Sequence, residues 1–283
     1  MARLLKGKIV ADTLMEKNRE TVSELKQKGL CPTLAVFRIG EKENDLSYEK
    51  GISKKAEEAG INVIKHVFSD DVSKEEFVSE LQKANLDENV HGILLFRPLP
   101  SGFNDDEIRN MIDPSKDVDG CNDLSLAGLF SNKDLGFAPC TAQSVMEILK
   151  FYDIDVSGMN VVVLGRSLVI GKPVSMMLLN KNATVTICHS KTRNIESIAC
   201  KADILICATG QMESVTKEYT NPDQVIIDVG ISWSDQKQKL CGDVLFEEVE
   251  PLVKDITPVP GGVGSLTSCL LITHVIESCK RSA

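Results

Sequence analysis

Short apolar segments alternate in strict turn with longer amphipathic ones, and this alternation restricts the fold of the chain more than any other feature. The apolar segments are typical of strands, and the segments between them have the apolar spacing of helices. Strands that alternate with helices pair in parallel through crossover connections, so the sequence predicts an α/β fold. The expected strands are TLAVFRI (33–39), INVIKHVF (61–68), VHGILLF (90–96), NVVVLG (160–165), ATVTIC (183–188), ADILICAT (202–209) and QVIIDV (224–229), the last four rich in β-branched residues and expected to be buried.

The 283 residues are enough for two domains. After the turn-rich segment DPSKDVDGCNDLS, the segment CTAQSVMEILKFYDI has a helical pattern with Thr141 as its expected N-cap, and we place the domain junction near it. The last helix, SLTSCLLITHVIESCK, is expected to fold back onto the first domain. The predicted domains are therefore 1–145 plus 266–283, and 146–265.

The composition favours a small-molecule ligand. A formal net charge of −9 without a long basic run argues against a surface for nucleic acid or anionic membrane. No segment has the roughly 20 consecutive apolar residues of a membrane span, and the start of the chain does not resemble a signal peptide. The 9 cysteines are scattered without a C-x-x-C pair, which predicts no metal site and a reducing, cytoplasmic environment.

The segment NVVVLGRSLVIGKPVSMMLL reads as a strand, a tight loop and a helix. Gly165 and Gly171 lie in the loop and Pro173 at the start of the helix, an arrangement in which backbone N–H groups can face a pyrophosphate. The spacing G-x-x-x-x-x-G differs from the usual G-x-G-x-x-G of dinucleotide sites, so an ordinary turn between strand and helix remains an alternative.

The end of the next strand indicates which dinucleotide binds. NAD sites place an acidic residue there for the ribose 2'-hydroxyl, but this strand is followed by Ser190 and Arg193, with no acid before Glu196. Together with Arg166 in the preceding loop, these residues predict a site for the 2'-phosphate of NADP. The alternative for each basic residue is an ordinary solvated surface charge.

Several long motifs in one order resemble the methylenetetrahydrofolate dehydrogenase/cyclohydrolase family. They are GRSLVIGKP, ATVTICHSKT, KDVDG, APCTA, GDV and TPVPGGVGSLT. The resemblance implies an N-terminal α/β domain completed by the C-terminal helix, a Rossmann-type NADP-binding domain, a folate site in the cleft between them, and a homodimer. It also implies that Ser167 and Ile231 contact the cofactor.

The family oxidises 5,10-methylenetetrahydrofolate with NADP and hydrates the methenyl product to 10-formyltetrahydrofolate. By the same resemblance, Asp119 binds the pterin ring, Tyr48 is an active-site residue that contacts the substrate, and the backbone at Pro260, Gly261 and Gly262 approaches folate and cofactor. The carboxylate of Asp119 suits pterin binding because it can accept hydrogen bonds from the amino group and the adjacent N–H of the pterin ring.

This sequence departs from the family at the residues expected to serve hydration. Bifunctional members carry Y-x-x-x-K, and Ile52 stands at the lysine position. Phe96 replaces a glutamine that contacts this lysine. At about 100° per residue, only Lys55 returns to the face of Tyr48, roughly 10 Å further along the helix. Lys55 and Arg97 remain the candidates for residual activity.

We therefore expect an NADP-dependent methylenetetrahydrofolate dehydrogenase in which the cyclohydrolase activity is lost or weak. Oxidation requires no proton transfer, because hydride loss leaves a cation stabilised by both flanking nitrogens, whereas hydration requires proton transfers. The alternatives are a bifunctional dehydrogenase/cyclohydrolase and a dinucleotide-binding sensor without catalytic activity.

Overall fold

The structure is a computed structural model, and it describes residues 1–282. The chain divides into two compact units. The three-stranded unit comprises residues 13–140 and the chain from Ser268 onward, and the six-stranded unit comprises residues 1–12 and 141–267. Helices α1 (Gly7–Gln27), α6 (Cys140–Phe151) and α10 (Thr267–Arg281) contain the points at which the chain leaves one unit for the other. Each unit has a parallel sheet, so the predicted two-domain α/β fold is confirmed.

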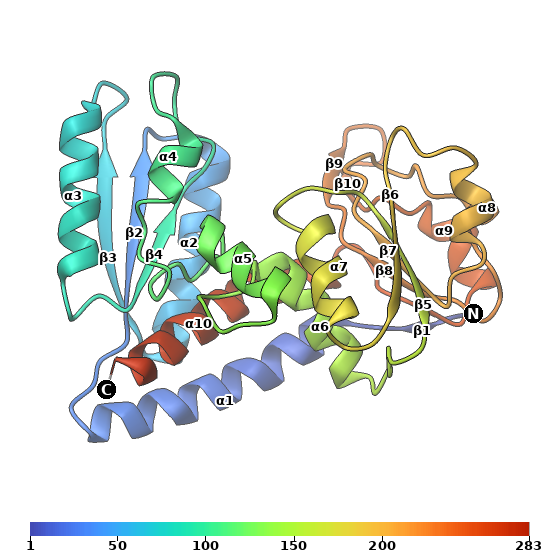
Figure 1. Ribbon diagram of the computed structural model, residues 1–283, viewed down its shortest axis with the longest axis horizontal. Helices are drawn as coiled ribbons and strands as arrows, with labels where there is room; N and C mark the ends of the chain where they lie inside the picture. Colours follow the sequence, from blue (N-terminus) through green and yellow to red (C-terminus); the bar gives the residue numbers. More distant parts are fainter. Residues whose placement is uncertain (283) are drawn as a thin grey trace. The chain divides into compact units, whose positions relative to one another are not determined.

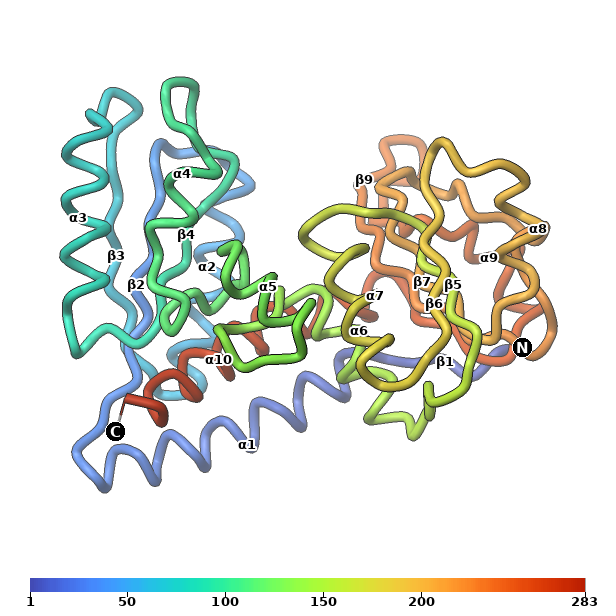
Figure 2. The backbone as a smooth tube through the Cα atoms, viewed as in Figure 1, coloured from blue at the N-terminus to red at the C-terminus, as the bar shows by residue number. Residues whose placement is uncertain are grey.

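The three-stranded unit has the strand order β3-β2-β4, with β2 (Thr33–Ile39), β3 (Asn62–Phe68) and β4 (Gly92–Leu95) all parallel. The chain runs from β2 to β3 on one side of it and then crosses to β4 on the other side. Right-handed crossovers in these two opposite directions place α2 (Glu43–Ala59) and α3 (Lys74–Leu86) on opposite faces of the sheet. Figure 2 shows these three strands side by side in the backbone trace.

Side-chain contacts agree with this arrangement of the helices. On the α3 face, Phe77 and Leu81 pack against Phe37 in a buried apolar cluster. On the α2 face, Arg38 binds Glu49 through a 2.8 Å hydrogen bond. The short helices α4 (Asp105–Arg109) and α5 (Asp123–Ser131) follow β4 along the chain.

The C-terminal helix α10 (Thr267–Arg281) completes the three-stranded unit, as expected from the sequence. It packs so closely on β4 that a Cβ atom on Gly92 would lie 2.8 Å from the side chain of Val275. The Ser278 hydroxyl also donates a 2.7 Å hydrogen bond to the Ser115 carbonyl. This contact joins α10 to the loop that contains the KDVDG motif, residues 116–120.

The large sheet of the six-stranded unit has the strand order β1-β11-β8-β7-β5-β6, and each pair of neighbouring strands within this sheet is parallel. The chain runs from β5 outward to β6 and then returns to β7 on the other side of β5 (Figure 1). In such sheets a ligand binds at the carboxyl ends of the strands where this reversal occurs. The strands are β1 (Arg3–Leu4), β5 (Asn160–Leu164), β6 (Thr184–Cys188), β7 (Ile204–Cys207), β8 (Val225–Asp228) and β11 (Asp255–Ile256).

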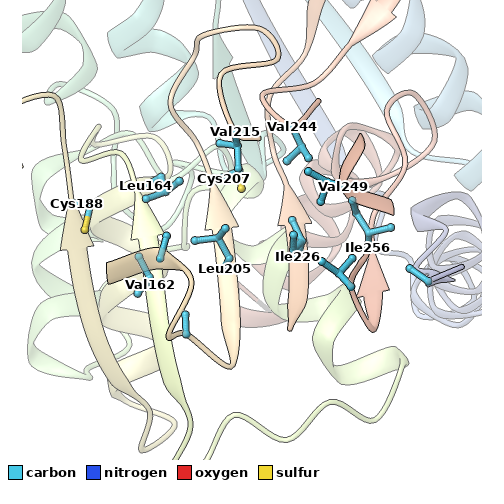
Figure 3. Packing of buried hydrophobic residues seen from close by; sticks show 14 residues of the cluster. Val162, Leu164, Cys188, Leu205, Cys207, Val215, Ile226, Val244, Val249 and Ile256 are labelled. Atoms are coloured by element: carbon cyan, nitrogen blue, oxygen red, sulfur yellow. The ribbon is translucent and has the colours of Figure 1, made fainter. Parts of the chain in front are cut away.

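Apolar side chains from neighbouring strands form the core of this unit. Figure 3 shows Val162, Leu205, Ile226 and Ile256 following one another across β5, β7, β8 and β11. Burial of these β-branched and leucine side chains stabilises a parallel sheet that carries helices on its faces. The remaining elements of the unit are α7 (Gly171–Leu179), α8 (Ile195–Ala199), η1 (Lys217–Tyr219), β9 (Ser232–Ser234), β10 (Lys239–Cys241), α9 (Phe246–Val249), η2 (Glu250–Leu252) and η3 (Val263–Ser265).

Three details differ from the sequence predictions. Residues 1–12, predicted in the first domain, belong to the six-stranded unit because β1 pairs with β11. Thr141 does not precede the helix as an N-cap, because α6 already begins at Cys140. Strand β6 is not buried along its length: it is the terminal strand of the sheet, with β5 as its recorded neighbour, and Cys188 is its buried residue.

Within residues 1–282, no helix is long and apolar enough to cross a membrane. In the same residues no group of histidine, cysteine and acidic side chains is arranged to hold a metal ion. All nine cysteines are free thiols.

Candidate active site

The loop between β5 and α7 lies close to the end of β7, and two glycines permit this approach. Gly165 has a φ of +126°, and a Cβ atom on it would lie 2.1 Å from the carbonyl oxygen of Ala208. A Cβ atom on Gly171 would lie 2.3 Å from the carbonyl oxygen of Gly165. Both positions require glycine, because the collision is with backbone atoms that cannot turn away. The first turn of α7 is thereby set beside a tight loop, an arrangement suited to a pyrophosphate.

A cavity of about 600 Å³ opens where β5, β6 and β7 end. This size suits a cofactor, since small-molecule sites measure roughly 300–1,000 Å³. The cavity is lined by Leu164, Gly165, Arg166, Ser167, Cys188, His189, Ser190, Thr192, Ile195, Ala208, Thr209, Gln211, Ser214, Val215 and Tyr219.

Of the residues predicted to bind the cofactor, four line this cavity, namely Gly165, Arg166, Ser167 and Ser190. Gly171 and Pro173 lie next to it in the first turn of α7. Arg193 is exposed and does not belong to the lining, whereas Thr192 does. The sequence analysis did not predict Thr209 and Gln211 as lining residues. Both directly follow β7, and ligands of parallel sheets bind at the carboxyl ends of strands, so their position in the sequence could have identified them.

The polar groups of the lining are suited to an anion. Within residues 1–282, the lining includes no carboxylate, and Arg166 is its only arginine or lysine. The turn after β6 is fixed internally: the His189 N–H donates to the Thr192 hydroxyl over 2.9 Å, and the Lys191 N–H donates to His189 Nδ1 over 3.2 Å. Ser190 is therefore held in a defined position between two hydrogen-bonded residues.

A second cavity of about 160 Å³ lies in the same unit, formed by the segment 258–265 together with Ile231. Gly261 has a φ of +99°, and a Cβ atom on Gly262 would lie 2.5 Å from the carbonyl oxygen of Pro258. The structure thus brings together Ile231, Pro260, Gly261 and Gly262, four residues that the sequence singled out. The backbone of this loop is open to a ligand because neither glycine carries a side chain.

In the three-stranded unit, Tyr48, Ile52 and Phe96 form an apolar corner. Ile52 is 0% exposed and Phe96 is 8% exposed. The rings of Tyr48 and Phe96 meet edge to face with centroids 5.7 Å apart, a favoured aromatic geometry. Tyr48 lies at the rim, 40% exposed. Burial of its phenol, with the charge of Asp119 as a second cause, raises the pKa of Tyr48 above its usual value, so the hydroxyl stays protonated.

A buried ion pair fixes which side of α2 faces the sheet. Glu49 Oε2 accepts from Arg38 Nε over 2.8 Å, and Glu49 Oε1 lies 2.8 Å from Lys65 Nζ. Although burial opposes it, pairing with Lys65 and Arg38 lowers the pKa of Glu49. Because Glu49 and Ile52 are both buried, Lys54 points outward, where it lies 4.0 Å from Glu58. Lys55 is half-buried, two turns along from Tyr48.

Asp119 lies in a loop that Asp117 holds in place. The fully buried Asp117 accepts hydrogen bonds from the N–H groups of Cys121 and Asn122 and from the Ser125 hydroxyl over 2.7 to 3.0 Å. Burial, followed by the charge of Asp117, raises the pKa of Asp119 from 3.8 to about 7. The carboxyl of Asp119 can therefore change its charge near neutral pH.

Two groups oppose this shift in the pKa of Asp119. The Cys140 thiol hydrogen bonds to the Asp119 carboxyl, and the positive charge of Arg97 also lowers its pKa. Burial, aided by the Asp119 charge, in turn raises the pKa of the Cys140 thiol well above its usual value. Cys140 is therefore a neutral hydrogen-bond donor to Asp119 rather than a nucleophile.

Arg97 is tied to the start of α4. Its Nε donates to Asp105 Oδ2 over 2.6 Å, its Nη2 lies 2.6 Å from the same oxygen, and Asp105 Oδ1 accepts from the Leu99 N–H over 3.1 Å. Arg97 is a permanent cation: burial lowers the pKa of its guanidinium, but the hydrogen bond to Asp105 together with the charges of Cys121 and Asp105 raises it overall. It cannot act as a base toward a water molecule.

Two family models match the chain. "Tetrahydrofolate dehydrogenase/cyclohydrolase, catalytic domain" matches residues 5–119, and "Tetrahydrofolate dehydrogenase/cyclohydrolase, NAD(P)-binding domain" matches residues 139–283. Among curated relatives, the Bifunctional protein FolD of Clostridium kluyveri is 46% identical over 99% of both chains. That of Carboxydothermus hydrogenoformans is 44% identical over 99% of this chain and 98% of its own.

Solved structures agree with the sequence matches. The bifunctional FolD enzyme of Campylobacter jejuni has a TM-score of 0.97 at 36% identity and covers 100% of both chains. The enzyme of Trypanosoma brucei, described in complex with NADP and an inhibitor, has a TM-score of 0.92 at 31% identity, with 99% of this chain and 98% of its own covered.

Proposed function

The chain belongs to the tetrahydrofolate dehydrogenase/cyclohydrolase family, and from that premise we propose that it is an NADP-dependent 5,10-methylenetetrahydrofolate dehydrogenase whose cyclohydrolase activity is lost or weak. The proposed loss of cyclohydrolase activity rests on the buried apolar corner, in which Ile52 and Phe96 stand where the family has lysine and glutamine. The alternative is the bifunctional enzyme, and the names of the relatives favour it.

The cavity of the six-stranded unit fits NADP. Glycine at 165 and 171 lets the loop pack against the Ala208 backbone and close on itself, the kind of tight turn before a helix that suits a pyrophosphate. Arg166 and Ser190 supply a charged fork and a hydroxyl for the 2'-phosphate, and the lining, as far as residues 1–282 define it, has no carboxylate to repel it. Bound NADP supplies a hydride acceptor.

Arg166 gives the first prediction. Removing it in Arg166→Ala should raise the KM for NADP about tenfold or more, because a charged hydrogen bond is worth roughly 1.5–3 kcal/mol. The KM for NAD should change little, since NAD has no 2'-phosphate. Steady-state kinetics with both cofactors measure this, and an equal loss with both would show that Arg166 does not read the phosphate.

The folate would be bound by side chains and by backbone. We assign the pterin to Asp119, contact with the folate also to Tyr48, and backbone contacts to Pro260, Gly261 and Gly262. Tyr48 suits this role because its ring is part-exposed and is held edge-on by Phe96. These assignments rest on the motifs together with the placement of each residue inside its own unit.

Hydride loss and hydration place different demands on these residues. Loss of a hydride from the methylene carbon gives a cation shared by two nitrogens, so the protein need only position the carbon against the hydride acceptor. Hydration must move a proton from the attacking water and deliver one to the departing nitrogen. A site that lacks proton acceptors can therefore support the first reaction and fail in the second.

The apolar corner offers no group for these proton transfers. Ile52 and Phe96 carry no polar atoms in their side chains, Tyr48 stays protonated, and Arg97 is a permanent cation. The raised pKa of Asp119 makes it the one titratable carboxyl near Tyr48 and Arg97 that can exchange a proton near pH 7. In our assignment, however, this carboxyl is occupied by the pterin.

The test is the product of the forward reaction. Purified protein with 5,10-methylenetetrahydrofolate and NADP should form reduced NADP and methenyltetrahydrofolate in equal amounts. Formation of reduced NADP without accumulation of the methenyl compound would support the bifunctional alternative. Cofactor binding without any reduction would instead indicate a sensor. The homodimer and the cytoplasmic location remain predictions.

A further inference from the structure

Within residues 1–282, one nitrogen of the Arg97 guanidinium, Nη1, makes no hydrogen bond or ion pair to another side chain. Nε and Nη2 bind Asp105 Oδ2, and among residues 1–282 no partner is recorded for Nη1. The side chain is 30% exposed, so this donor is within reach of a ligand. A planar guanidinium anchored on one side keeps its remaining N–H groups in a fixed direction, which makes them suitable for recognition.

Arg97 and Asp119 belong to one neighbourhood of the three-stranded unit. Arg97 follows β4, and β4 runs beside the loop that holds Asp119: the Ile93 N–H donates to the Lys116 carbonyl over 2.8 Å, and a Cβ atom on Gly92 would lie 2.7 Å from the side chain of Val118. The charge of Arg97 acts directly on the Asp119 carboxyl. A guanidinium held by Asp105 and the partly buried Asp119 carboxyl therefore lie in one neighbourhood and can act on one ligand.

A pterin presents a complementary edge. Its 2-amino group and N3–H donate hydrogen bonds, and the 4-oxo oxygen next to N3 accepts them. A carboxylate satisfies the two donors but leaves the 4-oxo oxygen unsatisfied, which is costly for a buried carbonyl. Ile52 and Phe96 contribute no donor from the other side. The guanidinium of Arg97 offers such a donor at Nη1, in addition to the Tyr48 hydroxyl, which stays protonated.

We propose that Arg97 and Asp119 together read the 2-amino-4-oxo edge of the pterin, with Arg97 donating to the 4-oxo oxygen and Asp119 accepting from N3–H and the 2-amino group. The inference rests on the proposed function, since it assigns a specificity-determining residue in that folate site. Asp105 is the positioning residue, because it holds the guanidinium through Nε and Nη2 and leaves Nη1 for the ligand.

The test compares two ring systems without turnover. Calorimetry at pH 8, where Asp119 is largely ionised, would measure the Kd of 2-amino-4-oxopteridine and of 2,4-diaminopteridine. The 4-amino ring presents a donor to Arg97 instead of an acceptor, so the wild-type protein should prefer the 4-oxo ring about tenfold. Arg97→Met should abolish the preference, and Arg97→Lys should keep part of it.

Kinetics supply an independent readout. Arg97→Met should raise the KM for methylenetetrahydrofolate about tenfold with an unchanged KM for NADP, which also shows that the variant is folded. The matched control is Lys74→Met, which removes the exposed Lys74–Glu107 pair of the same unit and should leave both values unchanged.

Two results would overturn the inference: a wild-type protein without preference for the 4-oxo ring, or an Arg97→Met variant that keeps the preference and the folate KM of the wild type. Absence of dehydrogenase activity in the wild-type protein is a different outcome. It would contradict the proposed function, while the pteridine preference would still decide the role of Arg97.

Discussion

In the proposed function, the reaction outcome depends most on Ile52. Because its side chain is fully buried, Ile52→Lys places an unpaired ammonium among apolar groups and should lower the free energy of unfolding by about 3–5 kcal/mol, the cost of an uncompensated buried charge. Phe96 gives the new ammonium no polar partner, so we expect little cyclohydrolase activity from this variant. The double variant Ile52→Lys/Phe96→Gln should recover more. The decay of methenyltetrahydrofolate absorbance measures both.

High activity in Ile52→Lys alone would contradict the role assigned to Phe96. Lys55→Met is the companion variant, since Lys55 is the only lysine of α2 that returns to the Tyr48 face. If hydration in the wild-type protein depended on Lys55, this variant would abolish it.

If Asp119 binds the pterin, as we propose, substrate binding depends on pH. Its pKa is raised to about 7 by burial and by Asp117, so the carboxyl is protonated below that pH and ionised above it. The ionised form accepts both pterin donors. The KM for methylenetetrahydrofolate should therefore fall about tenfold in total as the pH rises from 6 to 8, with most of the fall below the pKa.

The control is Asp119→Asn, which should have a high KM that does not change with pH over the same range. A wild-type KM that is flat from pH 6 to 8 would contradict the assignment. The same shift has a consequence for stability: between 3.8 and about 7 the folded protein retains a proton that the unfolded chain has released, so this residue lowers the free energy of unfolding as the pH rises.

Among the elements, the loop between β5 and α7 offers the sharpest test of the cofactor site. Gly165→Ala would place a Cβ atom 2.1 Å from a backbone oxygen, at a φ of +126°. The loop must then shift, and the affinity for NADP should fall about tenfold or more, since positive φ alone costs roughly 1–3 kcal/mol. Titration with NADP followed by calorimetry measures the change.

Gly158→Ala is the matched control for this variant. Gly158 also has a positive φ, of +75°, but its Cβ position is open space. It should lose comparable stability and retain cofactor affinity. Equal NADP affinity in the two variants would show that the close approach of Gly165 to Ala208 does not shape the site.

The elements also show how far the sequence alone can be trusted. The strands from β2 to β8 are recognisable because apolar runs bounded by turns have little alternative in an α/β chain. Strand β1 is two residues long, and its pairing with β11 depends on a contact between residues about 250 positions apart, which no local pattern encodes.

At the site, sequence motifs were enough to predict the glycines and the apolar corner. They did not predict contacts between residues that are distant in the sequence. The link between Arg97 and Asp105, and the charge relation between Arg97 and Asp119, arise where separate segments meet. The exposed position of Arg193 likewise depends on the course of a turn rather than on residue type.

For the whole molecule, the proposed function is that of an enzyme that keeps the cofactor site and the pterin carboxylate of its family while the corner beside Tyr48 has become apolar. Such an enzyme releases a methenyl compound that another protein must hydrate if the cell is to obtain 10-formyltetrahydrofolate. The difference that we propose from the bifunctional relatives is chemical rather than architectural, because the fold matches that of the Campylobacter jejuni enzyme over the full length of the chain.

The most direct measurement isolates the second reaction. Purified protein is mixed with methenyltetrahydrofolate, in the absence of NADP, and the loss of methenyl absorbance is compared with that in buffer alone. We predict that the rate with protein equals or barely exceeds the buffer rate, while the same preparation reduces NADP with methylenetetrahydrofolate. Decay well above the buffer rate and proportional to protein concentration would contradict the central claim and identify the protein as bifunctional.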